Sequence, residues 1–345
     1  MTEVRSETFY NRNMDLPNQL LMGAIDSHIH AGPVLKSNPS YPDPIQVAME
    51  ARDAGMRALV YYDVFGWASG TSFMVNRHVE GIQTFGGYLM NSCHGGLNPR
   101  AVKTALYLGD GCRFISFGSH CTYYSAERES TVVDGKLVPF KDLYPKFVKE
   151  ELSRAVRIPL EDPVPDELAE ILTMVAEHPE VYLNTGHVSP DEAMRLLDLA
   201  ERFGIKKVLI AHPVRGRLTV EQQKEAARRG AFLEGCLVDW LYPDVPRTHY
   251  YVEREYMTRG SELPSTRTTA PIWMNVIREV GPEHFVLATD YGVRAAPPIQ
   301  GMRTLIATLL DYEFTPVEIR TMTATNPAQL IGLDSLSPAR TLGRK

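Results

Sequence analysis

The sequence predicts a (β/α)8 barrel, and three observations lead to this prediction. The chain has 345 residues, which suits one barrel of roughly 250 residues with insertions. Eight short apolar runs alternate with amphipathic stretches, which is the pattern of a parallel α/β fold. No GxGxxG motif follows the first run, which disfavours an open dinucleotide-binding sheet. We therefore expect one domain that spans residues 1–345.

The eight apolar runs are the expected strands. Each is apolar on both faces, as strands covered by helices on one side and by a filled barrel on the other should be. They span residues 24–30, 57–63, 85–91, 112–118, 181–187, 206–213, 231–238 and 285–292. Eight strand–helix units favour a closed barrel over an open sheet.

The stretches between these strands carry the start and stop signals of helices. An Asn, Ser or Thr stands before the first turn of three of them, often with Pro after it, and glycine follows the last turn. These signals define helices over 44–55, 98–109, 189–204 and 219–230. The alternation of strand and helix is thus supported by the apolar runs of the strands and by the capping signals of the helices.

Two segments are longer than barrel loops need to be, and both follow the C-terminal end of a strand. They span 121–165, between the fourth and fifth strands, and 241–271, between the seventh and eighth. Asp134-Gly135 in the first favours a hairpin with a type I′ turn. We expect both insertions to cover the active-site face, with a surface excursion or an oligomer contact as the alternative. Residues 1–23 form an N-terminal extension.

Composition and charge exclude several classes of protein. A net charge of −6 and a pI near 6.0 disfavour nucleic-acid binding. No run of about 18 apolar residues predicts a membrane span, and residues 1–19 do not resemble a secretory signal. The four cysteines are scattered and form no disulfide or zinc motif, so we expect a cytoplasmic protein. The expected partner is a small-molecule substrate. A homo-oligomer is compatible with the sequence.

Two histidines at the end of the first strand are the first candidate metal ligands. In the segment Asp26-Ser27-His28-Ile29-His30, residues two apart share a face of the strand. His28 and His30 should therefore point into the barrel together, while Ile25 and Ile29 face the helices. Asp26 lies one step deeper, where it can orient an imidazole or hold the strand end.

Three further candidates occur at the ends of later strands. His187 ends the fifth strand, His212 the sixth and Asp290 the eighth, each with inward parity. Barrel enzymes carry their sites at this C-terminal face of the sheet. Histidine together with carboxylate suits zinc, manganese or iron(II), and we expect zinc first.

These residues resemble the signature of a known family. The DSHIH segment, the two later histidines and the final aspartate resemble the amidohydrolase superfamily over about residues 23–333. The stretches GGLNPRAV (95–102) and TNPAQLIGL (325–333) resemble an uncharacterised branch of it. The resemblance implies a cation on His28, His30, His187 and Asp290. It also implies that Asp290 takes a proton from water, and that His212 binds a second metal or polarises the substrate.

The sequence departs from that signature in one place. Two-metal members carry a lysine or glutamate near the fourth strand, whereas CRFISFG (112–118) has neither, so we expect one metal. Other residues near strand ends are weaker candidates for substrate contacts: His94, His120, Arg215, Arg217 and Glu234. The two arginines suit a substrate carboxylate, and a solvated charge pair is the alternative.

Three functions are consistent with this pattern. The first is metal-dependent hydrolysis of a C–N bond in an amide, a cyclic amide or an amidine. The second is non-oxidative decarboxylation of an aromatic or unsaturated acid, with an arginine on the carboxylate. The third is a barrel that has lost catalysis, which the intact ligand set disfavours. We expect the first.

Overall fold

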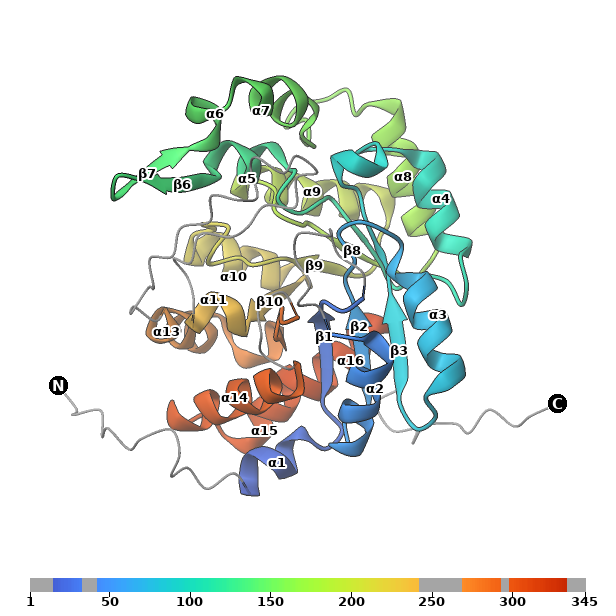
Figure 1. Cartoon of the computed structure of the whole chain (residues 1–345), viewed down its shortest axis with the longest axis vertical. Helices are drawn as coiled ribbons and strands as arrows, with labels where there is room; N and C mark the ends of the chain where they lie inside the picture. Colours follow the sequence, from blue (N-terminus) through green and yellow to red (C-terminus); the bar gives the residue numbers. More distant parts are fainter. Residues whose placement is uncertain (1–14, 33–41, 242–268, 293–297, 334–345) are drawn as a thin grey trace.

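In the computed structural model, parallel strands stand at the centre and helices surround them (Figure 1). The structure describes residues 15–32, 42–241, 269–292 and 298–333. One sheet contains β1 (Ile25–Ile29), β2 (Ala58–Tyr61) and β3 (Gln83–Gly86). The other contains, in order, β11 (Phe285–Ala288), β10 (Phe232–Cys236), β9 (Val208–Ile210), β8 (Tyr182–Asn184), β5 (Phe114–Ser116) and β4 (Tyr88–Leu89).

The two sheets meet at two seams. At the first seam, β3 and β4 belong to one continuous segment with Gly87 between them. A Cβ atom at Gly87 would lie 2.3 Å from the Phe114 ring, so only glycine allows this close passage. At the second seam, the Asp290 amide donates to the His28 carbonyl at 2.8 Å and the His30 amide donates to the Tyr291 carbonyl at 2.7 Å. The predicted barrel fold is confirmed.

Each predicted strand is present, but most are shorter than the apolar run that predicted them. The run 85–91 is divided between β3 and β4. His187, His212 and Asp290 follow their strands instead of ending them. His212 and Asp290 adopt the left-handed region, with φ of 44° and 53°, which a strand residue cannot do. The backbone of His212 and Asp290 therefore turns before the side chain enters the barrel, and strand alternation alone does not give the direction of these side chains.

The four predicted helices are confirmed as α2 (Pro44–Asp53), α4 (Pro99–Tyr107), α9 (Pro190–Phe203) and α10 (Val220–Arg228). Asn98 caps α4, and Ser189 and Thr219 form capping boxes with α9 and α10. The remaining helices in the ring are α3 (Ala68–His78), α8 (Asp166–Ala176), α13 (Ala270–Val280), α14 (Pro298–Asp311), α15 (Pro316–Arg320) and α16 (Asn326–Ile331). Among the described helices, none has the length and apolar character needed to cross a membrane.

The buried apolar side chains form two large clusters. One lies between the strands and the surrounding helices and includes Ile29. The other takes side chains from most of the strands, including Ile25 and Tyr182, together with Leu330 of α16. Ile25 was predicted to face the helices with Ile29, but the pairing of β1 with β2 shifts register between Asp26 and Ile29. This irregularity breaks the simple alternation of faces.

The first predicted insertion forms a small substructure in the upper part of Figure 1. It contains α5 (Tyr123–Arg128), the hairpin β6 (Ser130–Val133) and β7 (Lys136–Pro139), α6 (Phe140–Leu143) and α7 (Pro145–Glu150). The hairpin turn is confirmed, with positive φ at both Asp134 and Gly135. Of the second insertion, residues 242–268 lie outside the described residues, after α11 (Leu237–Leu241). In the N-terminal extension, α1 (Asp15–Leu21) packs on α14 and α15.

The backbone packing at Gly186 gives a testable prediction. Gly186 and Gly204 both have positive φ, but a Cβ atom at Gly186 would lie 2.1 Å from the Gly118 carbonyl oxygen, whereas Gly204 has open space. We expect Gly204→Ala to lower the free energy of unfolding by about 1–2 kcal/mol, which is the cost of the backbone conformation. Gly186→Ala should cost about 1–3 kcal/mol more, because backbone must move.

Guanidinium denaturation of both variants measures this difference. Equal losses of stability in the two variants would contradict the close approach of Gly186 to Gly118.

Candidate metal centre

His28, His30 and Asp290 come together at the seam between β1 and β11. The Nε2 atoms of His28 and His30 lie 3.5 Å and 2.9 Å from Oδ1 of Asp290. Asp26 fixes this arrangement, because it accepts hydrogen bonds from the amide and the hydroxyl of Thr289 at 3.0 Å and 2.6 Å. The deeper aspartate therefore holds the two strand ends that carry the three side chains.

The other nitrogen of each imidazole faces a hydrogen-bond acceptor. Nδ1 of His30 lies 2.9 Å from the Tyr62 carbonyl oxygen, which can only accept, so this nitrogen carries the hydrogen. Nδ1 of His28 lies 3.0 Å from Oε1 of Glu234, and Nδ1 of His212 lies 2.7 Å from Oδ2 of Asp239. Such partners fix the tautomer and orientation of metal-binding histidines. For His28 and His30, this places Nε2 toward Asp290.

The charges of this group depend on each other. Burial opposes the charged imidazolium, but Glu234 and Asp290 raise the pKa of His28 to about 9. At Asp290 burial works against the carboxylate, yet His28 and His30 hold its pKa well below the usual range. Burial raises the pKa of Asp26 to about 7. Without a cation, a proton on His28 thus offsets part of the negative charge of the buried carboxylates.

The residues fit a divalent cation. The donor atoms of His28, His30 and Asp290 all lie within 4.8 Å of one another, and all three side chains are buried. Close by, Oε2 of Glu234 is buried and has no hydrogen-bond partner among the described residues. An unmatched buried carboxylate oxygen is costly, and a cation compensates it. Imidazole with carboxylate is a donor set for zinc and other first-row metals.

Two unusual backbone features occur at the ligands. His212 and Asp290 both adopt positive φ, a conformation that costs energy and must be held by its surroundings. A Cβ atom at Gly292 would lie 1.7 Å from the His30 carbonyl oxygen, so the chain after Asp290 runs directly against the end of β1. A larger residue at this position would separate Asp290 from His30.

A pocket adjoins these ligands, and more histidines lie in its wall. The ring of His187 lies 5.0 Å from the rings of His120 and His212, measured between centroids. His187 therefore lines the same cavity as His28, but it is outside the group of three close donors. His120 is buried and its Nδ1 lies 2.6 Å from Oε1 of Glu129, which comes from the first insertion.

A neighbouring pocket shares His187 and His212 with the first. Arg215 and Arg217 both line it, as does Arg128 of α5. Arg215 also lies 3.7 Å from Oδ1 of Asp239. The predicted arginines are thus near the site, at its outer wall.

His94 does not line either of these cavities. Its Nδ1 lies 3.2 Å from the Leu89 carbonyl oxygen, and its ring stacks on Tyr88 and Trp67. The structure therefore brings most of the candidate residues to these two pockets, and His94 lies outside both.

Three residues near the site were not recognised from the sequence. Cys236 follows Glu234 by two positions on β10, so the same parity rule could have indicated it. Asp239 and Glu129 carry no such signal, since each reaches its histidine from a loop or a short helix. Burial, followed by the carboxylates around it, raises the pKa of Cys236 well above its usual value.

Comparison with solved structures shows enzymes of similar fold. A β-aspartyl dipeptidase from Fervidobacterium islandicum has 15% identity and a TM-score of 0.55, over 90% of this chain and 72% of that one. An amidohydrolase from Burkholderia multivorans with bound zinc has 12% identity and a TM-score of 0.52, over 90% and 99%. An organophosphorus hydrolase variant from Deinococcus radiodurans has 13% identity and a TM-score of 0.51, over 91% and 94%.

Comparison by sequence identifies a family. No curated protein matches the chain. A family model, described as a family of unknown function (DUF6282), matches residues 23–234. The match includes His28, His30, His187, His212 and Glu234 and ends before Asp290. With more than half of its length matched, and with the barrel fold seen in amidohydrolases, the chain belongs to the DUF6282 family.

Proposed function

We propose that this protein is a metal-dependent hydrolase with its cation on His28, His30 and Asp290. One observation carries this proposal: three buried donor atoms converge at the C-terminal end of a barrel, and each histidine presents Nε2 because Nδ1 faces an acceptor. His187, which lines the same cavity, is the proposed fourth ligand. Zinc is the proposed metal, with manganese or iron(II) as substitutes, and a similar structure has bound zinc.

The protein side chains have separate roles in this proposal. A bound cation lowers the pKa of water to about 7 and polarises a carbonyl group. Asp290 orients a water molecule at the site and accepts its proton. His212, whose Nδ1 is held by Asp239 at 2.7 Å, would stabilise the developing oxyanion of the substrate as an imidazolium, or would bind a second metal through Nε2 as a neutral imidazole. His120, paired with Glu129, lies in the cavity wall where a leaving group would depart.

The proposed substrate is a small molecule with a C–N bond. The two adjoining cavities support it, since together they offer space beside the ligands and an outer wall with Arg215 and Arg217. The barrel fold is compatible with hydrolysis of peptide bonds, because a dipeptidase has a similar fold, and with hydrolysis of other bonds, because an organophosphorus hydrolase has a similar fold too.

The described cysteines are all free thiols, which supports the proposed cytoplasmic location.

Decarboxylation is the second candidate, and the two arginines favour it. Arg215 and Arg217 line the cavity next to His212, where they can bind a substrate carboxylate. Release of carbon dioxide without incorporation of oxygen from labelled water would select this reaction. Incorporation of labelled oxygen into the product would select hydrolysis.

The metal assignment predicts the metal content of two histidine variants. Protein purified without chelators should contain zinc by plasma mass spectrometry, and His30→Ala should lose at least about one equivalent of it. His78→Ala is the control, because His78 is exposed on α3 and lies away from the site. Equal metal content in the wild type and in His30→Ala, or no metal in the wild type, would contradict the assignment.

The charges of the site predict how stability depends on pH in the metal-free protein. The pKa of His28 is about 9 in the folded chain and about 6.5 when unfolded, so its contribution is complete below pH 6.5 and is lost as pH rises through 9. The loss should be on the order of 3 kcal/mol. Urea denaturation at several pH values measures it.

Glu234→Gln serves as the matched control for that measurement. It removes the carboxylate that raises the pKa of His28 most strongly and keeps the size of the side chain. The loss of stability between pH 6.5 and 9 should therefore become smaller. The same slope in both proteins would contradict the pairing of His28 with Glu234.

A further inference from the structure

A second group of donor atoms lies on the other side of His28, and the reaction proposed above gives no metal-binding or catalytic role to two of its members, Glu234 and Cys236. We propose that His28, His212, Glu234 and Cys236 form a second cation site, which takes zinc. Their donor atoms all lie within 4.8 Å of one another, and all four residues are buried. This site is separate from the group of His30 and Asp290, although it shares His28.

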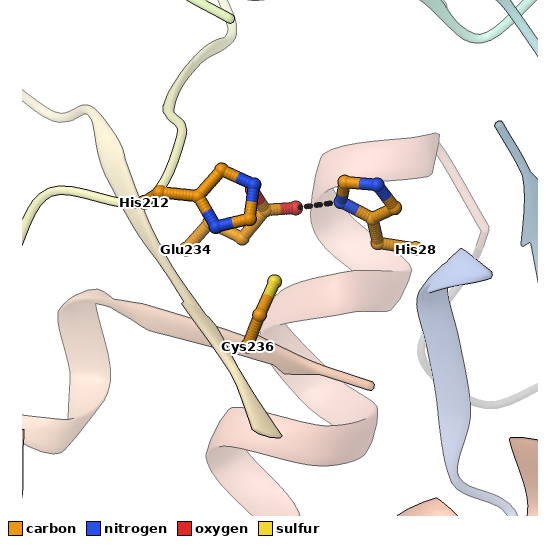
Figure 2. Close-up of side chains that lie close together, drawn as sticks. All are labelled: His28, His212, Glu234 and Cys236. Atoms are coloured by element: carbon orange, nitrogen blue, oxygen red, sulfur yellow. Dashed lines mark hydrogen bonds and ion pairs between the residues drawn. The ribbon is translucent and has the colours of Figure 1, made fainter. Parts of the chain in front are cut away.

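Three parts of the barrel bring these side chains together (Figure 2). Glu234 and Cys236 stand two positions apart on β10, so they share a face of the strand. His28 comes from β1 and His212 follows β9. Nδ1 of His28 lies 3.0 Å from Oε1 of Glu234, and Nε2 of His212 lies 3.9 Å from Oε2. In Figure 2 the Cys236 sulfur points toward this carboxylate.

The Glu234 carboxylate indicates a ligand independently of the distances. Glu234 has no exposed surface, and its Oε2 has no hydrogen-bond partner among the described residues. Such an oxygen is unfavourable inside a protein unless a positive charge or a donor meets it. A cation between Glu234, His212 and Cys236 would meet it directly.

The donor types select the cation. A thiolate with two imidazoles and one carboxylate is a four-ligand set for zinc, and its sulfur disfavours magnesium and calcium. Ligands must lose their protons when they bind a metal. The cation would therefore replace the proton between His28 and Glu234 and the proton of the Cys236 thiol, and both protons would pass to solvent.

The shared histidine links the two sites. Nε2 of His28 faces Asp290 and Nδ1 faces Glu234, so after loss of both N–H protons to solvent one imidazolate can bind a cation on each side. With both sites filled, the positive charge on both faces of His28 balances Asp290 and Glu234. The second site needs no hydrolytic activity for its existence, so it can be tested without a substrate.

Cobalt titration of the metal-free protein tests the second site. Cobalt(II) reports a cysteine ligand through a thiolate-to-cobalt charge-transfer band in the near ultraviolet. We expect two equivalents and this band in the wild type, and one equivalent without the band in Cys236→Ser. Cys93→Ser is the control, because Cys93 is exposed, and it should keep both.

Two more variants separate the sites and guard against a folding defect. Glu234→Gln keeps the thiol and should weaken the cobalt that gives the band at least tenfold. His30→Ala should keep the band and lose the other equivalent. Circular dichroism shows whether each variant is folded.

The outcomes separate the second site from the proposed function. One equivalent without the band in the wild type, or a band that persists in Cys236→Ser, overturns the second site. A band with one equivalent in both the wild type and His30→Ala supports the second site and contradicts the metal assignment of the proposed function.

Discussion

The attachment of the first strand to the last is the constraint on which the site depends. Asp26 accepts two hydrogen bonds from Thr289, and backbone hydrogen bonds between the ends of β1 and β11 continue this connection. The same attachment joins the two sheets at this edge and brings Asp290 to within 3.5 Å of His28. Since the ligands come from opposite ends of the chain, the site exists only when the barrel is closed. Folding and metal binding should therefore be coupled.

Charge balance is the second constraint, and it explains why the site needs a cation. Asp290 and Glu234 lie on either side of His28, and all three are buried. One imidazolium can balance one carboxylate, so a second positive charge is needed for the other. A divalent cation supplies it and leaves His28 neutral as a ligand. The orphaned Oε2 of Glu234 marks the place where this charge is missing.

Much of the fold could be predicted from the sequence because its signals are local. Apolar runs, caps and the Asp134-Gly135 turn depend on neighbouring residues, and the structure contains the strands, helices and hairpin that they predicted. The role of Cys236 was missed although it shares the parity of Glu234. Asp239 and Glu129 could not be predicted, since one lies on the short helix α11 and the other in a loop, where no strand alternation indicates the direction of a side chain. The positive φ of Asp290 and His212 was likewise not predicted, because both residues were expected to continue their strands.

Anomalous diffraction from crystals soaked in zinc locates the metal without a substrate, and it therefore tests whether His28, His30 and Asp290 bind a cation together. We predict an anomalous peak bonded to Nε2 of His28, Nε2 of His30 and Asp290, at about 2.0–2.2 Å from each atom. A zinc peak elsewhere in the protein with none among these three residues, or Asp290 still in direct contact with His30, would contradict this assignment.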